Sequence, residues 1–404
     1  MVRIPVREFN TCRATSDGRE SVPPRNERGV STAAGFRYKM EPVSLLEEFI
    51  RARIKKDGPI RFDEFMKHAL YHPEHGYYTK SPKIGRSGDF YTSVSVGPLF
   101  GRLLGLQFAQ MWHQLGQPDP FWMIEQGAHD GQLSRDILEW CAAETPEFRA
   151  AIRYVVVDGP HIADTLGRSL LQLERDKPEG VFFSNELVDA FPVRAVAFRK
   201  GEWYERWVTT AKEGFAWTEK TIDSLDLKLA VAERKIPEVE GYTTEIGLRA
   251  RDWMQKVAEA MHRGYVVTVD YGFLSHHYYA PQRTTGTLTA YARHRRVDNV
   301  LARVGEQDLT THVDFTWLAR AGRRGGLTNL GFVDQQRFLT GIAHDELAGV
   351  PGPHAGVAES TTAWQTLTHP QHLGTRFFAL VQGKNAPEQL DCLRYARASD
   401  LAMI

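Results

Sequence analysis

Short apolar runs, each followed within two residues by an acidic or amide residue, recur through the middle of the chain. They occupy residues 121–124, 153–157, 181–183 and 265–269, and are rich in valine, isoleucine and aromatic residues. Continuous runs of this kind are typical of parallel strands that are buried on both faces. Helical periodicity follows the first run. The pattern therefore predicts an α/β fold with an open, mostly parallel sheet.

The first run leads into a turn bounded by glycines. Glu125 ends the predicted strand, Gly127 and Gly131 bound the turn, and an amphipathic helix follows through Leu133 and Ile137. Glycines at such a turn let the backbone approach a ligand beyond the strand ends. The dinucleotide pattern needs three glycines and an acid about 20 residues later, which this chain lacks. An acid before the turn instead suits S-adenosylmethionine; the alternative is an ordinary strand-to-helix turn.

Further polar side chains stand at the ends of the next two predicted strands. Asp158 ends the second run, where acids commonly bind ribose hydroxyls. Asn185, Glu186 and Asp189 follow the third run. Since parallel strands end at one edge of a sheet, we expect these side chains to face one cleft. The alternative for the trio is a capped helix start, with asparagine as the cap and acids in the first turn.

The N-terminal third has three predicted parts. Residues 1–39 are rich in arginine, serine and proline and lack apolar periodicity, which predicts a disordered extension. Met40 is a possible alternative start. Helical spacing then returns over 45–50 and 62–70, and a glycine- and aromatic-rich segment over 71–93 has the character of a binding loop. His72 and His75 lie there without further ligands at metal-binding spacing, so we predict no metal site.

The remaining chain is predicted to extend the sheet and to carry insertions. Alternation around Lys200-Gly201 predicts a β-hairpin over 193–217, and a helix is expected over 245–262. Late strands are expected at 327–332 and 377–382, the second of them as an antiparallel edge. The predicted organisation is an extension (1–39), a helical cap with a cofactor-covering loop (40–115), an α/β domain (116–384) with insertions at about 193–262 and 273–330, and a tail (385–404).

Composition excludes several classes of protein. The chain has 404 residues, with 50 basic and 50 acidic side chains, so it carries no net positive field to attract nucleic acid. Its three cysteines are widely spaced, which argues against a disulfide framework. No apolar run approaches the roughly 18 residues that span a bilayer. We therefore expect a cytoplasmic protein; the arginine-rich leader leaves the mitochondrial matrix as the alternative.

Many separated motifs, in order, resemble the MidA-like S-adenosylmethionine-dependent methyltransferases. This family includes mitochondrial members that methylate a protein arginine during complex I assembly. The resemblance runs from about Val43 to Lys384. It rests on Gly58–Ile60, Phe65-Met66, Tyr71–Pro73, Gly76–Tyr78, Gly88–Phe90, Thr92-Ser93, Phe100-Gly101, Glu125, Gly127, Gly131, Leu133, Asp136–Leu138, Asn185-Glu186, Asp189-Ala190, Pro192, Asp270–Gly272, Gly286–Leu288, Tyr291, His294, Gly305–Asp308, Thr310 and His312–Phe315.

The resemblance implies a Rossmann-like methyltransferase core with an N-terminal helical region, S-adenosylmethionine as the cofactor, and a protein substrate such as a respiratory-complex subunit. Carboxylates can orient an arginine, because its planar guanidinium donates two parallel hydrogen bonds to the two oxygens of a carboxylate. We therefore assign Glu186, Asp189 and Asn185 to catalysis. The residues assigned to the cofactor are Glu125, Gly127, Gly131 and Asp158, with Gly88, Asp89 and Thr92 closing over it.

Two departures from the family pattern fall in loops expected around the cofactor. His129 stands where the family usually has the middle glycine of the turn, and Val94-Ser95 replaces a Pro-Glu pair. A Cβ and an imidazole at position 129 would crowd a turn that relies on close backbone approach. The alternative function is thus a catalytically weak or inactive methyltransferase fold that acts as an assembly scaffold.

Overall fold

The computed structural model describes residues 44–80, 92–157, 172–292 and 295–404. The predicted extension over 1–39 lies outside these ranges. So do three residues assigned to the cofactor, Gly88, Asp89 and Asp158.

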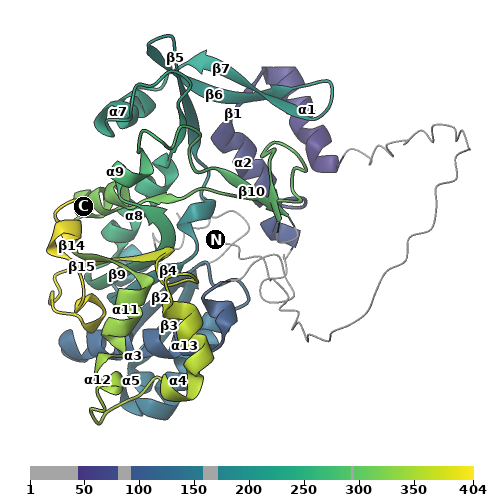
Figure 1. Ribbon diagram of the computed structural model, residues 1–404. Coiled ribbons are helices and arrows are strands. Elements are labelled where there is room, and N and C mark those ends of the chain that lie inside the picture. The colour runs from purple at the N-terminus through teal and green to yellow at the C-terminus, as the bar shows by residue number, and fades with distance from the viewer. Residues whose placement is uncertain (1–43, 81–91, 158–171, 293–294) are drawn as a thin grey trace, which may run out of the picture.

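A seven-stranded sheet forms the core, in the order β14-β15-β9-β4-β2-β3, with β13 paired to the end of β9 (Figure 1). Strands β2, β3, β4 and β9 are parallel, as the four apolar runs predict. The burial predicted for the second run is wrong, because β3 is an edge strand and only Val157 within it is fully buried. The bounds are β2 Phe121–Gln126, β3 Ile152–Val157, β4 Glu179–Asn185, β9 Arg263–Phe273, β13 Val313–Asp314, β14 Thr328–Asp334 and β15 Phe377–Lys384.

Strand β15 is antiparallel to β9, as predicted, but it does not form the edge of the sheet. Strand β14 pairs antiparallel with its other side and takes the edge position. The sequence of β15 is consistent with this place, because Ala379, Leu380 and Val381 are all buried, which an edge strand open to water would not require.

Helices cover both faces of this sheet. Phe121 and Met123 of β2 belong to one apolar core with helices α3, α4 and α11, whereas Trp122 and Ile124 belong to a second core with α8 and α10. Alternate residues of a strand point to opposite faces, so a central strand needs apolar residues throughout. The helices span α3 Leu99–Gln114, α4 Gln132–Glu144, α8 Leu248–Ala260, α10 Phe315–Arg324 and α11 Gln335–Ile342.

A separate five-stranded sheet combines four strands inserted between β4 and β9 with the short strand β1 from the N-terminal part of the chain. Its order is β1-β6-β5-β8, with β7 beside β6, and it lies with α1, α2 and α7 at the end of the molecule opposite α4 and α5 (Figure 1). The bounds are α1 Leu45–Asp57, β1 Ile60–Arg61, α2 Phe62–Tyr71, β5 Arg194–Arg199, β6 Glu202–Thr210, β7 Phe215–Thr221, α7 Leu225–Glu233, β8 Thr243–Ile246 and, in the core, α5 Pro146–Ala151.

The hairpin predicted around Lys200-Gly201 is confirmed as β5 and β6. Lys200 and Gly201 have φ angles of 52° and 81°, which the tight turn between twisted strands requires. The helix expected from Glu245 begins later, because Thr243–Ile246 forms strand β8 against β5. Pairing with β5 overrides the helical spacing there, and β-branched residues at three of these four positions favour the strand.

Smaller elements complete the chain. A three-stranded sheet joins β10 Thr289–Ala292, β11 Arg295–Val297 and β12 Asp308–Thr310. The C-terminal residues pack on the core, where the Cys392 backbone N–H donates to Gln107 Oε1 at 2.8 Å. The other helices are α9 Ser275–Tyr278, α12 His344–Leu347, α13 Thr361–Thr368 and α14 Ala398–Leu401. Within the described ranges, no helix has the length and apolarity needed to cross a membrane.

Candidate functional site

A cavity of about 290 Å³ lies at the carboxyl ends of β2 and β4. It is bounded by the glycine turn after β2, the start of α4, the segment after β4 and a loop before α3. The lining residues are Thr92, Val94, Ser95, Glu125, Gly127, Ala128, His129, Asp130, Gln132, Leu133, Asn185 and Glu186. The structure therefore gathers five of the residues that the sequence assigns to catalysis or cofactor binding: Thr92, Glu125, Gly127, Asn185 and Glu186.

The turn after β2 has left-handed backbone at three positions. Gly127, His129 and Gly131 have φ angles of 83°, 49° and 75°. A Cβ on Gly127 would stand 3.1 Å from Leu187 Cδ1, and the Gly131 N–H donates to the Ala128 carbonyl at 2.8 Å. His129 thus keeps a backbone conformation that normally favours glycine, and its imidazole forms part of the cavity wall.

Glu125 places a buried carboxylate beneath this turn. Its Oε2 accepts a hydrogen bond from the Tyr154 hydroxyl of β3 at 2.6 Å. Only about 3% of Glu125 is exposed, so the carboxylate is held in a fixed position at the cavity wall. Tyr154 was not singled out from the sequence. In the parallel pair of β2 and β3, Glu125 lies opposite Val156, and Tyr154 is two residues earlier on the same face of β3. A tyrosine at that position is a signal that a buried acid on the neighbouring strand has a hydrogen-bond donor.

The loop at Thr92 is closed by reciprocal hydrogen bonds. The Thr92 N–H donates to Ser95 Oγ at 2.9 Å, and the Ser95 N–H donates to Thr92 Oγ1 at 3.1 Å. The Ser95 hydroxyl also donates to the Thr92 carbonyl at 2.8 Å. Thr92 and Ser95 therefore satisfy each other's backbone N–H groups, as the first and fourth residues of a capping box do. Ser95 fills this role at the position where the family usually has glutamate.

Glu186 has a strained backbone and an unusual carboxyl group. Its φ is 53°, a conformation that costs energy for a residue with a side chain and that often marks functional sites. Its Oε1 accepts from the Ser93 N–H at 3.1 Å and from Asn185 Nδ2 at 3.3 Å. Burial raises the pKa of Glu186 from 4.5 to about 7. Glu186 Oε2 and Asn185 Oδ1 are buried and have no hydrogen-bond partner among the described residues.

Asp189, the third residue of the predicted trio, does not line the cavity. It lies in the short turn Val188–Ala190, is 1% exposed, and accepts a hydrogen bond from the Tyr271 hydroxyl at 2.5 Å. Asp270 also has a structural position, because its carboxylate accepts from the N–H groups of Val188 and Asp189 at 2.8 and 3.3 Å. Burial raises the pKa of Asp270 well above its usual value.

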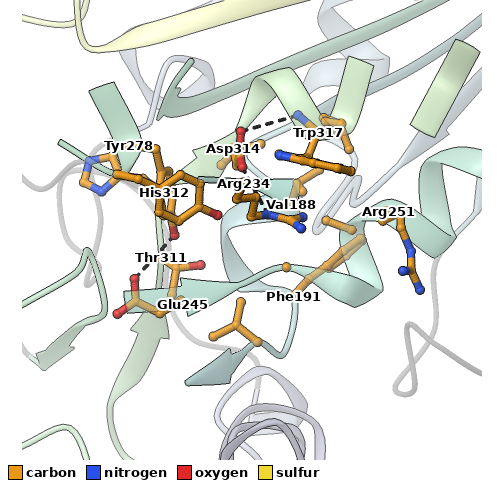
Figure 2. A pocket seen from close by; sticks show the side chains of 16 residues that line it. Val188, Phe191, Arg234, Glu245, Arg251, Tyr278, Thr311, His312, Asp314 and Trp317 are labelled. Atoms are coloured by element: carbon orange, nitrogen blue, oxygen red, sulfur yellow. Dashed lines mark hydrogen bonds and ion pairs between the residues drawn. The ribbon is translucent and has the colours of Figure 1, made fainter. Parts of the chain in front are cut away.

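A second, much smaller cavity of about 30 Å³ lies beneath the inserted sheet (Figure 2). Figure 2 shows Arg234 between Asp314 and Trp317; Arg234 Nε is 3.5 Å from Asp314 Oδ2 and the guanidinium stacks 4.1 Å from the indole ring. Glu245 accepts bonds from the Thr287 N–H and hydroxyl at 2.9 and 3.0 Å. Arg234 pairs with Asp314, Glu245 accepts hydrogen bonds from neutral donors, and the space holds about one water.

The structure describes no metal centre: within the described ranges, no group of three or more His, Cys, Asp and Glu side chains could hold an ion. His72 instead stacks on His75, and its Nδ1 accepts from the Glu74 and His75 N–H groups at 3.3 Å.

The fold and this cavity define the class of protein. Residues 103–333, more than half of the chain, match the model of a family of S-adenosyl-L-methionine-dependent methyltransferases, Methyltransf_28. The chain belongs to this family and is an S-adenosylmethionine-dependent methyltransferase, as the resemblance predicts.

Individual relatives are similar over most of their length. The chain is 26% identical to "Protein arginine methyltransferase NDUFAF7 homolog, mitochondrial" of Drosophila melanogaster, with 82% of this chain and 83% of the relative covered. It is 27% identical to the Mus musculus protein arginine methyltransferase NDUFAF7, mitochondrial, with 81% and 82% covered. A solved structure of a COG1565 superfamily member from Burkholderia thailandensis, bound to S-adenosyl-homocysteine, is 29% identical with a TM-score of 0.73, covering 88% of this chain and 96% of that one.

The residues around the cavity fit this cofactor. Gly127 lines the cavity with backbone alone at a left-handed φ that favours glycine, and the buried carboxylate of Glu125 suits a ligand with a cationic amino group. Asn185 Oδ1 and Glu186 Oε2 are acceptors at the same wall that are unpaired among the described residues. Such orphaned buried atoms favour a polar ligand.

We expect His129→Gly to strengthen S-adenosylmethionine binding about threefold or more. Glycine removes the Cβ and the imidazole from the cavity wall, so the turn and the cofactor can approach each other more closely. A threefold change in affinity corresponds to roughly 0.7 kcal/mol. Calorimetry on both chains measures the change. His129→Ala is the matched control, because it removes the ring but keeps the Cβ. Weaker binding by both variants would mean that the imidazole contacts the cofactor.

Proposed function

We propose that this methyltransferase methylates an arginine side chain of a protein partner. The observation that carries the proposal is the Glu186 carboxyl group, which faces the cavity beside the glycine turn with one oxygen anchored and the other unpaired among the described residues. Further support comes from the names of the relatives, which are protein arginine methyltransferases.

A carboxylate at this place suits a guanidinium. Arginine stays charged in water, and its planar fork matches carboxylate oxygens, so a fixed acid can aim one nitrogen at a neighbouring methyl group. Anchoring of Glu186 Oε1 by the Ser93 N–H and by Asn185 leaves Oε2 to accept from the substrate. Asn185 Oδ1 is a second acceptor at the same wall. We assign substrate orientation to these two residues, and Asp189 keeps a supporting place behind them through Tyr271.

The cofactor supplies an activated methyl group on its sulfonium. The chain has to hold that group in line with the acceptor nitrogen and exclude water, which is catalysis by positioning. We assign Glu125 and Gly127, which line the cavity, to cofactor binding, with Thr92 at the loop across the cavity. Gly131, which ends the turn after β2 but is not part of the cavity lining, keeps its predicted place in this set. Asp158, Gly88 and Asp89 stay predicted cofactor residues outside the described ranges.

A respiratory-complex subunit is the partner that the family resemblance favours. The names of these relatives include the word mitochondrial, which fits the matrix as the compartment. The cytoplasmic expectation stays a prediction. The chain's balance of 50 basic and 50 acidic residues gives no reason to expect nucleic acid as the acceptor.

The scaffold alternative rests on His129 and Val94-Ser95. His129 keeps left-handed backbone at the turn, and Ser95 closes the Thr92 loop with its own hydroxyl. Both loops thus retain a closed geometry despite the substitutions, which favours the catalytic proposal.

The direct test compares proteins from cells with and without this chain by mass spectrometry. We expect methylated, and specifically dimethylated, arginine on at least one partner polypeptide, lost when the chain is deleted and restored by the intact gene but not by Glu186→Gln. Methylation that persists in the deletion would contradict the proposal. So would new methyl groups found on residues other than arginine.

A further inference from the structure

A chain of hydrogen bonds connects Glu186 to the C-terminal part of the molecule. The Ser93 N–H donates to Glu186 Oε1 at 3.1 Å, and the Ser93 hydroxyl donates to Gln335 Oε1 at 3.0 Å. Gln335 Nε2 in turn donates to the Leu367 carbonyl of α13 at 2.9 Å. Ser93 and Gln335 both have a relative exposure of 0%.

We infer that Ser93 and Gln335 are positioning residues that hold the Glu186 carboxyl group in its orientation toward the acceptor. The inference rests on the proposed role of Glu186 as the acid that orients the substrate. Neither residue belongs to the cavity lining, and both lie just outside the segment 103–333 that matches the family model.

The direction of each bond makes the arrangement specific. A serine hydroxyl can rotate and can either donate or accept, but a glutamine amide has distinct donor and acceptor ends. Because Gln335 Nε2 is engaged by the Leu367 carbonyl, Oε1 is the end that meets Ser93. The Ser93 hydroxyl must therefore donate to Gln335. The backbone N–H of Ser93 donates separately to Glu186 Oε1, so one residue joins the two side chains.

Glu186 needs such an anchor because its own backbone does not fix the side chain. Its φ of 53° places it in a sparsely populated region, and Asn185, its other partner, is the adjacent residue at a longer 3.3 Å. Gln335 is the first residue of α11, which follows β14 directly, so the anchor is built on the edge of the core sheet. Groups placed on rigid elements hold their geometry better than groups on loops.

The test uses Gln335→Met, which keeps the length of the side chain and removes both hydrogen bonds, and Ser93→Ala, which removes only the hydroxyl. The matched control is Gln382→Met. Gln382 has the same 0% exposure and donates to the Ala319 carbonyl and to Asn329, away from the cavity. We expect the two Gln→Met variants to lose similar amounts of thermal stability. A change in the Glu186 pKa or in the reaction rate that appears only in Gln335→Met is then due to positioning and not to weakened folding.

The first measurement titrates the infrared band of the protonated Glu186 carboxyl group, identified by its absence in Glu186→Gln, in the chain without cofactor. The hydrogen bond from the residue-93 N–H stabilises the ionised form of Glu186. Both variants keep this N–H but remove the contact between Ser93 and Gln335 that holds it in place, so a displaced and weaker hydrogen bond raises the pKa. We expect the midpoint, near pH 7 in the parent, to move up by about half a pH unit or more in Gln335→Met and Ser93→Ala. Gln382→Met should leave it unchanged.

The second measurement follows transfer of radiolabelled methyl groups from S-adenosylmethionine to extract proteins of cells that lack the chain. We expect both positioning variants to lose about tenfold or more in rate, with cofactor affinity within about threefold, since small displacements at a reacting centre are costly. The double variant should lose no more than the worse single variant, because both act through one chain of bonds.

Two results separate this inference from the proposed function. An unchanged midpoint and rate in both Ser93→Ala and Gln335→Met would overturn the positioning inference, whatever Glu186→Gln does. Full activity of Glu186→Gln would instead overturn the proposed role of Glu186 itself.

Discussion

Glu186→Gln is expected to abolish methyl transfer while leaving S-adenosylmethionine affinity within about tenfold, or roughly 1.4 kcal/mol. The substitution keeps the shape of the side chain and removes its negative charge. A neutral amide cannot pair with a guanidinium as a carboxylate does. The measurements are initial rates of methyl transfer to hypomethylated extract proteins and calorimetry with the cofactor. Glu186→Asp is a second variant, which keeps the charge but withdraws it from the acceptor.

Glu186→Gln is expected to abolish methyl transfer but to increase the stability of the folded chain above pH 7. The pKa of Glu186 in the folded chain is about 7, above its ordinary value of 4.5. The folded state therefore binds more protons between these values, and stability falls as pH rises from about 4.5 to about 7. We expect Glu186→Gln to be more resistant to denaturant than the parent at pH 8, by at most about 3 kcal/mol, and to show little gain at pH 4.

These two measurements together decide the role of Glu186. If Glu186→Gln loses turnover but is as stable as the parent at pH 8, or more stable, then Glu186 acts in the reaction and its ionised carboxylate destabilises the folded chain. Normal turnover would remove Glu186 from the mechanism. Lost turnover together with reduced stability at pH 8 would indicate a structural role instead.

Glu125→Ala is expected to weaken S-adenosylmethionine binding by about 100-fold or more, or roughly 2.7 kcal/mol. A buried carboxylate that binds a cationic or hydroxyl group contributes strongly, because charged hydrogen bonds are worth about 1.5–3 kcal/mol. Glu125 is 3% exposed, and its position is fixed by Tyr154. Calorimetry at low millimolar cofactor measures the loss.

Tyr154→Phe is the matched control for Glu125. It removes the hydroxyl that donates to Glu125 Oε2 and leaves the carboxylate in place, so we expect a loss of less than about tenfold. Equal losses in the two variants would mean that the orientation of Glu125, rather than its charge, determines affinity. Unchanged affinity in Glu125→Ala would exclude this residue from the cofactor site.

Much of the core was predictable because local sequence carries its periodicity. Apolar runs at 121–124, 181–183 and 265–269 became parallel strands, since a strand buried on both faces needs apolar residues at every position. Glycines at 127 and 131 marked the turn after β2 in the same way, because left-handed backbone restricts the choice of residue.

Two secondary-structure expectations required long-range information. The helix predicted over 245–262 begins only at Leu248, because residues 243–246 pair with β5, which is about 50 residues away in the chain. The place of β15 inside the sheet depends on β14 beside it. Strand pairing is a contact between distant segments, so local periodicity does not encode the neighbour.

The sequence by itself determined the class of fold, the glycine turn, and the presence of acids at the strand ends. Only the tertiary structure decided which acids face the cavity: Glu186 does, whereas Asp189 turns toward Tyr271. Only the tertiary structure also brought Ser93 next to Gln335, which lies 242 residues further along the chain. The physical reason is that side-chain direction and the pKa of a carboxyl group depend on what packs around it, and those neighbours come from distant parts of the chain.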